Sequence, residues 1–167
     1  MKKLLIGLLL AAMLSGCGVE PVYETIGDVW GQAEPAVSPG RMRVLLPEGA
    51  EMEVMDGNGD SFYRVGDWDL WTRVLSGGDI NKTLETLSGL DAGCLTVIDH
   101  KLGDYQCHET TWSATAEEGT QVIRAGILDD GSYHYCLCVS VPQEDATQVD
   151  ELFEQVLEGT SIIHTAP

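Results

Sequence analysis

From Arg41 onward, short runs of alternating apolar and polar residues are separated by turn residues, which is the pattern of an antiparallel sheet. The turns contain Gly, Asn and Asp, as in Gly103-Asp104, and these residues tolerate the backbone angles of tight turns. We therefore expect strands at 41–46, 51–55, 61–65, 68–75, 94–101, 105–114, 120–128 and 133–141. The last four are predicted to form a meander.

Two helices interrupt this pattern. The first is predicted over 80–88, with Asp79 as its N-cap and Gly89 after its end. The second begins with a pair that resembles a capping box, Asp145 and Gln148. Its apolar residues follow helical spacing: Val149, Leu152, Phe153, Val156 and Leu157. This stripe predicts a helix that packs one face on the sheet, so the fold class is α+β.

The chain begins with a different pattern. Lys2 and Lys3 precede an apolar run at 4–14, and the small residues Ser15 and Gly16 follow it. A basic start, a short apolar run and a small-residue end are typical of a secretory signal peptide. The run is too short for a lasting membrane span, because a helix needs roughly 20 apolar residues to cross a bilayer.

The end of this leader, Leu14-Ser15-Gly16-Cys17, resembles the lipobox of bacterial lipoproteins. The resemblance implies that the Cys17 sulfur carries a diacylglyceryl group and that the leader is cut just before it. It also implies an anchor on the extracytoplasmic face of the cell membrane, since two or more acyl chains hold a protein stably. The alternative is a secreted soluble protein with an ordinary cleavage site.

We divide the chain at the points where its composition changes. The signal peptide is 1–16, and an acidic tether that contains proline follows at 17–40. The single α+β domain is 41–163, and 164–167 form a tail.

Acidic residues dominate the chain, with 27 Asp and Glu against nine Lys and Arg and a formal net charge of −18. The leader holds two of the nine basic residues and no acidic residue, so the rest of the chain carries −20. Binding to nucleic acid depends on Lys and Arg that neutralise phosphates, so this charge excludes nucleic acid as a partner. We interpret the acidity as a means of solubility rather than a specific site.

From Arg41 to about Ile163, the order of elements resembles that of the PsbP-like α/β/α sandwiches, especially in the strand 133–141 and the helical stripe after it. The resemblance implies an antiparallel sheet of about six to eight strands packed with helices. It also implies a docking role, because PsbP-like domains mostly serve as extrinsic subunits or protein-binding modules. The segments 23–29 and 127–135 resemble lipoproteins of Firmicutes-type gut bacteria, which implies a lineage and no activity.

Four cysteines remain besides the lipobox cysteine, and an even number in an exported domain allows three disulfide pairings. We expect the turn after residue 101 to place Asp99 opposite Cys107. Alternation then puts Cys94 on the face of Cys136 and Cys138 and turns Cys107 away from them. We interpret the four as buried free thiols that behave as small apolar groups.

Two weak metal patterns are present. His134, Cys136 and Cys138 alternate along one predicted strand and share a face, where nitrogen and sulfur ligands suit a soft metal. Their spacing matches no known zinc motif, so we favour a packed face of the sheet.

The second pattern is a calcium-loop spacing made by Asp56, Asn58, Asp60 and Asp67. Ser61 stands where such a loop needs glycine, so a hairpin tip is the first interpretation of this segment.

No nucleophile, base and orienting partner converge in the sequence, so we expect neither an enzyme nor a cofactor. The favoured interpretation is a membrane-anchored, extracytoplasmic module that binds a protein or another part of the envelope. The alternative is a small-molecule or metal-binding lipoprotein of a transport system. It requires an apolar pocket, for which Trp68, Trp71 and Trp112 are the candidate lining residues, although tryptophans packed in a core need no ligand.

Overall fold

A computed structural model describes residues 39–55, 60–116 and 119–164 of the chain. The predicted leader, the predicted lipobox, the predicted tether up to residue 38, and Asp56 and Asn58 therefore lie outside the described residues. Within the described part, no helix is long and apolar enough to cross a membrane.

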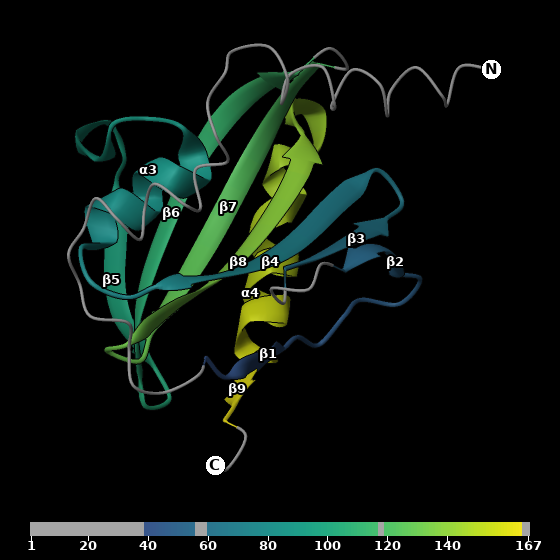
Figure 1. The fold of residues 1–167 in the computed structure, drawn as a ribbon. Helices are drawn as coiled ribbons and strands as arrows, with labels where there is room; N and C mark the ends of the chain where they lie inside the picture. Colours follow the sequence, from purple (N-terminus) through teal and green to yellow (C-terminus); the bar gives the residue numbers. More distant parts are fainter. Residues whose placement is uncertain (1–38, 56–59, 117–118, 165–167) are drawn as a thin grey trace, which may run out of the picture. The chain divides into compact units, whose positions relative to one another are not determined.

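Seven strands form one antiparallel sheet in the order β2-β3-β4-β8-β7-β6-β5 (Figure 1). Their bounds are β2 Glu51–Met55, β3 Ser61–Val65, β4 Trp68–Ser76, β5 Val97–Leu102, β6 Tyr105–Ala116, β7 Gly119–Asp129 and β8 Tyr133–Pro142. Strands β5 to β8 neighbour one another in chain order, which confirms the predicted meander. Two short strands, β1 (Arg41–Arg43) and β9 (Ser161–Ile163), pair separately.

The helices cover opposite faces of this sheet, as Figure 1 shows. Helix α4 (Ala146–Glu158) packs on one face, and α3 (Ile80–Ser88) packs on the other, followed by the short 3-10 helix η1 (Ala92–Cys94). Another 3-10 turn, η2 (Gln143–Asp145), leads into α4. The predicted α+β class with helices on both faces of an antiparallel sheet is confirmed.

Strand β8 lies between these two layers, and eight of its ten residues are buried. A strand covered on both faces has an almost continuous apolar sequence, as its run from Tyr133 to Val141 does. Its odd-numbered residues face α4 and its even-numbered residues face α3. The central strand therefore takes part in both halves of the core.

Helix α4 has the predicted stripe, and all five of its apolar residues are buried. Where it crosses β7, the absent side chain of Gly126 lets it come close. A Cβ there would lie 3.0 Å from Leu157 Cδ1 and 3.1 Å from Phe153 Cζ. The predicted capping box is wrong in one respect: the Asp145 carboxylate caps no backbone N–H and instead accepts from the Gln148 amide at 3.2 Å.

Helix α3 follows its prediction more closely. The Asp79 carboxylate accepts a hydrogen bond from the backbone N–H of Asn81, and Gly89 ends the helix with a φ of 70°. The first strand is shorter than predicted, ending at Arg43, and β9 was not predicted.

The hairpin between β5 and β6 differs from the prediction by one residue. Leu102 pairs with Tyr105 across a two-residue turn, so His100 lies opposite Cys107. Gly103 has a φ of 61°, the positive angle that the first central residue of a tight hairpin turn requires. A one-residue change of register moves a side chain to the other face, so His100 faces α4 with Cys107.

Candidate functional site

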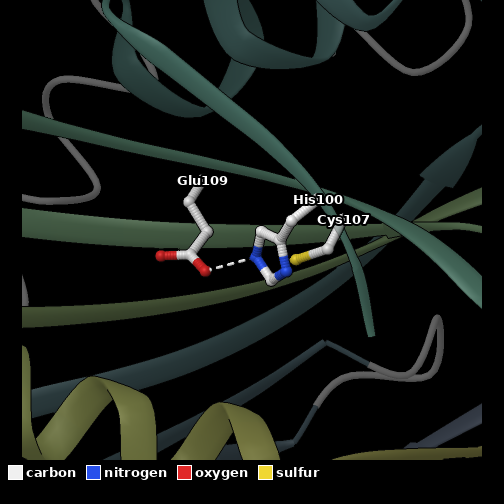
Figure 2. A group of neighbouring side chains, drawn as sticks. All are labelled: His100, Cys107 and Glu109. Atoms are coloured by element: carbon white, nitrogen blue, oxygen red, sulfur yellow. Dashed lines mark hydrogen bonds and ion pairs between the residues drawn. The ribbon is translucent and has the colours of Figure 1, made fainter. Parts of the chain in front are cut away.

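The face of the sheet that packs against α4 also carries a polar cluster on its outer strands. His100 comes from β5, and Cys107 and Glu109 come from β6. His100 and Cys107 are cross-strand partners, and Glu109 is two residues farther along the same face. Figure 2 shows the three side chains turned toward one another, and one ligand atom from each lies within 4.8 Å of the others. We call these residues the β5–β6 cluster.

Glu109 is the centre of the hydrogen bonds around the cluster. Its Oε1 lies 2.6 Å from His100 Nε2, and its Oε2 accepts from Arg124 Nη2 at 2.8 Å. The side chain of Glu109 is only 13% exposed, which makes these contacts stronger than those of a surface pair. One carboxylate thus holds both the histidine and the arginine.

Arg124 joins the cluster to α4. Its Nη1 donates to Asp150 Oδ1, and its guanidinium carbon lies 4.6 Å from the ring centre of Phe153. Burial alone would lower the pKa of Arg124, but the hydrogen bonds to Glu109 and Asp150 outweigh it and raise that pKa. The guanidinium is therefore a fixed positive charge between sheet and helix.

Cys107 is fully buried, and this determines what its thiol can do. Burial, followed by the negative charge of Glu109, raises the pKa of Cys107 to about 12. A reactive cysteine needs a lowered pKa and access to substrate, and Cys107 has neither. The three residues are arranged to offer ligand atoms rather than to attack a substrate.

The opposite face carries the predicted group of His134, Cys136 and Cys138. All three are buried and share one face of β8, as alternation predicted, and that face packs against α3. His134 and Cys138 are four residues apart on an extended strand, a separation of about 13 Å. They therefore do not converge on one metal ion.

His134 is instead held by the helix above it. Its Nδ1 lies 2.7 Å from Thr83 Oγ1 of α3, whereas its Nε2 has no hydrogen-bond partner and lies 3.8 Å from Asp129 Oδ2. Burial lowers the pKa of His134, although the charge of Asp129 opposes that effect. The ring is a neutral core group near neutral pH.

The two predicted calcium ligands that the structure describes, Asp60 and Asp67, are not brought together either. Asp60 lies just before β3 and forms an ion pair with Arg73 at 2.9 Å, whereas Asp67 lies beyond the other end of β3. An extended strand of this length separates the two carboxylates by about 20 Å. These two residues therefore cannot ligate a single ion.

The apolar pocket required by the transport alternative is not formed by the three tryptophans. Trp68 packs in the α4 half of the core, and Trp71 and Trp112 pack in the α3 half. A depression of about 450 Å³ lies between the β3–β4 turn and the start of α4, and polar side chains line it, among them Arg64 and Glu144. The three tryptophans are therefore core residues that are divided between the two faces of the sheet.

The four cysteines form no disulfide, and three of them are buried as predicted. Cys94 is different: it lies in η1 rather than in a strand, and it is exposed. Cys107 does face away from Cys136 and Cys138.

Sequence reasoning missed the β5–β6 cluster. The signal that could have found it is the Gly103-Asp104 pair, which favours a two-residue turn and places His100 on the face of Cys107.

No family model matches the chain, and no curated protein matches its sequence. Solved structures do match. LpqN of Mycobacterium tuberculosis, described as involved in cell envelope biogenesis, is 10% identical with a TM-score of 0.55, over 88% of this chain and 99% of LpqN. Cyanobacterial PsbP (CyanoP) of Synechocystis sp. PCC 6803 is 11% identical with a TM-score of 0.53, over 80% of this chain and 99% of CyanoP.

The fold is PsbP-like. A Bacteroides thetaiotaomicron protein is also similar, with 17% identity and a TM-score of 0.52 over 75% of this chain. The match covers 47% of that protein, so the chain spans about half its length. At these identities the likenesses establish the fold alone.

Proposed function

We propose that this protein is a lipid-anchored module on the extracytoplasmic face of the cell membrane, and that it docks onto a protein of the cell envelope. The observation that carries the proposal is the sequence Leu14–Cys17, which resembles a lipobox and precedes the acidic tether and the α+β domain that we predict. The PsbP-like fold is consistent with it, since a protein of that fold is described as involved in cell envelope biogenesis.

The chemistry of the domain also favours binding over catalysis. The buried thiol of Cys107, beside a histidine and a carboxylate, has a raised pKa, so it is not an activated nucleophile. The formal charge of −20 after the leader favours a partner with a basic surface. Acylated Cys17 would hold the domain at the membrane, where an envelope partner is reached by diffusion in two dimensions.

The anchor is tested by feeding cells an alkyne-tagged fatty acid and measuring its incorporation into the purified protein. We expect labelling of the natural chain and of Cys94→Ala, and none of Cys17→Ala. Cys94 is a matched control because it is an exposed cysteine outside the lipobox. Label that persists in Cys17→Ala would contradict the anchor.

Docking is tested by photocrosslinking in cells from exposed apolar positions of the domain. Ile98, Leu45 and Met52 are suitable, since they are 61%, 57% and 54% exposed. We expect one position to give a discrete protein adduct, and we expect the yield of that adduct to fall when Cys17→Ala removes the anchor. The same adducts at the same yield without the anchor, or no adduct from any position, would contradict the proposal.

A further inference from the structure

The β5–β6 cluster combines an imidazole, a thiol and a carboxylate. We propose that His100, Cys107 and Glu109 form a binding site for a zinc ion. The proposal goes beyond the docking function and rests on other residues, so either can fail without the other. No other group of three His, Cys, Asp or Glu side chains brings its ligand atoms together in this way in the described ranges 39–55, 60–116 and 119–164.

Zinc suits this set because it accepts nitrogen, sulfur and oxygen ligands in one tetrahedral site. With metal–ligand bonds of about 2.0 to 2.3 Å, the ligand atoms lie roughly 3.3 to 3.7 Å from one another. The three atoms are already within 4.8 Å, so side-chain rotations of about 1 Å complete the geometry. The ion would take the place of the hydrogen bond between His100 Nε2 and Glu109 Oε1, and the neutral imidazole would keep its one proton on Nδ1. The thiol proton of Cys107 would go to solvent.

The surroundings hold the carboxylate in a suitable position. Arg124 occupies Glu109 Oε2, which leaves Oε1 for the ion. A side chain that hydrogen-bonds to a metal ligand fixes the orientation of that ligand and strengthens metal binding. The charges also balance: the thiolate and the carboxylate neutralise Zn²⁺, and Asp150 neutralises Arg124.

The cluster is reachable from one side. The His100 side chain is 37% exposed and that of Glu109 is 13% exposed, whereas Cys107 is fully buried. An ion would enter on the His100 side, and the fourth ligand position would face solvent and hold water. Three protein ligands with one open position are typical of zinc sites that exchange a ligand.

The test uses the full chain in detergent, stripped by a chelator and carrying Cys17→Ala, so that the lipobox sulfur takes no part. Co²⁺ serves as the spectroscopic probe. We expect one equivalent of Co²⁺ to give a thiolate-to-cobalt charge-transfer band together with the visible bands of a four-coordinate ion. Zn²⁺ should displace it and abolish both bands.

Variants decide which residues are responsible. Cys107→Ala should abolish the charge-transfer band, and Glu109→Gln should weaken Co²⁺ binding at least about tenfold. His100→Gln should do the same, and because His100 is partly exposed this variant keeps the test valid if Cys107→Ala fails to fold. Cys94→Ala and Cys138→Ala, which remove an exposed thiol and a buried thiol of the other face, should bind as the parent does.

Two results would overturn the proposal. One is a parent protein that gives no charge-transfer band with Co²⁺. The other is a band that survives Cys107→Ala or disappears in Cys94→Ala, because the exposed thiol would then be the ligand.

Discussion

Each face of the central sheet carries a histidine and at least one buried thiol, but the two faces surround these groups differently. On the α3 face, Cys136 and Cys138 lie among apolar side chains such as Ile127 and Ala125, and the ring of His134 is hydrogen-bonded to Thr83. On the α4 face, Cys107 lies beside an imidazole and a carboxylate.

This difference shows that residue type alone does not make a site. Burial raises the pKa of the thiols on both faces, to about 12 for Cys107 and for Cys138. What distinguishes Cys107 is that other ligand atoms converge on it. On the α3 face, His134 and the two cysteines follow one another along a single strand, and their side chains spread over about 13 Å.

The largest expected effect concerns the packing of the two helices. Phe153→Ala should lower the free energy of unfolding by about 3 to 5 kcal/mol, because the ring is fully buried between Gly126 and Arg124. Leu84→Ala in α3 should cost about 2 to 4 kcal/mol. Urea unfolding measures both. A larger loss for Leu84→Ala would mean that α3, rather than α4, dominates the core.

Zinc should stabilise the protein through the α4 face and not through the α3 face. At 100 times its dissociation constant, a ligand that binds only the folded state adds about 2.7 kcal/mol to the free energy of unfolding. We expect this gain in the parent chain and in Cys138→Ala but not in Cys107→Ala, measured by urea unfolding with zinc and with a chelator. An equal gain in all three proteins would place the ion elsewhere.

Breaking the link between the β5–β6 cluster and α4 should lower the free energy of unfolding by a smaller amount. Arg124→Met leaves the largely buried Glu109 without its arginine, and we expect a loss of about 2 kcal/mol. Arg43→Met, an exposed arginine in β1, is the matched control and should change stability by less than about 0.5 kcal/mol. If the two losses are similar, the Arg124 network adds nothing to the α4 face.

The smallest effect is the pH dependence contributed by His134 on the α3 face. Burial holds its folded-state pKa below the ordinary 6.5, so the unfolded chain takes up the proton first as the pH falls. Its contribution to stability is therefore present above about pH 6.5 and is lost below it, down to the folded-state pKa. His134→Gln should flatten the fall in urea midpoint between about pH 7 and pH 5. An unchanged slope would mean that other groups cause it.

The sequence was sufficient to predict those helices and strands whose structure is decided by local pattern. The stripe from Val149 to Leu157 fixes α4, and Asp79 and Gly89 fix both ends of α3. Strand β9 could not be predicted, because its three residues depend on pairing with β1, more than a hundred positions earlier. Short strands have little pattern of their own.

The β5–β6 cluster was not predicted because it depends on the register between two strands. Alternation tells which residues of one strand share a face, but the register between strands depends on one turn. With Asp99 opposite Cys107, His100 would face α3, whereas the two-residue turn brings it to Cys107. A shift of one residue in the register of this hairpin thus decides whether the histidine faces α3 or lies beside the other proposed zinc ligands.

The most direct test of the contrast between the two faces is anomalous diffraction at the zinc edge from crystals of the zinc-loaded protein. We expect one peak on the α4 face, within about 2.0 to 2.3 Å of the ligand atoms of His100, Cys107 and Glu109. We expect no peak beside Cys136 or Cys138. A peak on the α3 face, or zinc bound away from Cys107, would contradict the proposed zinc site.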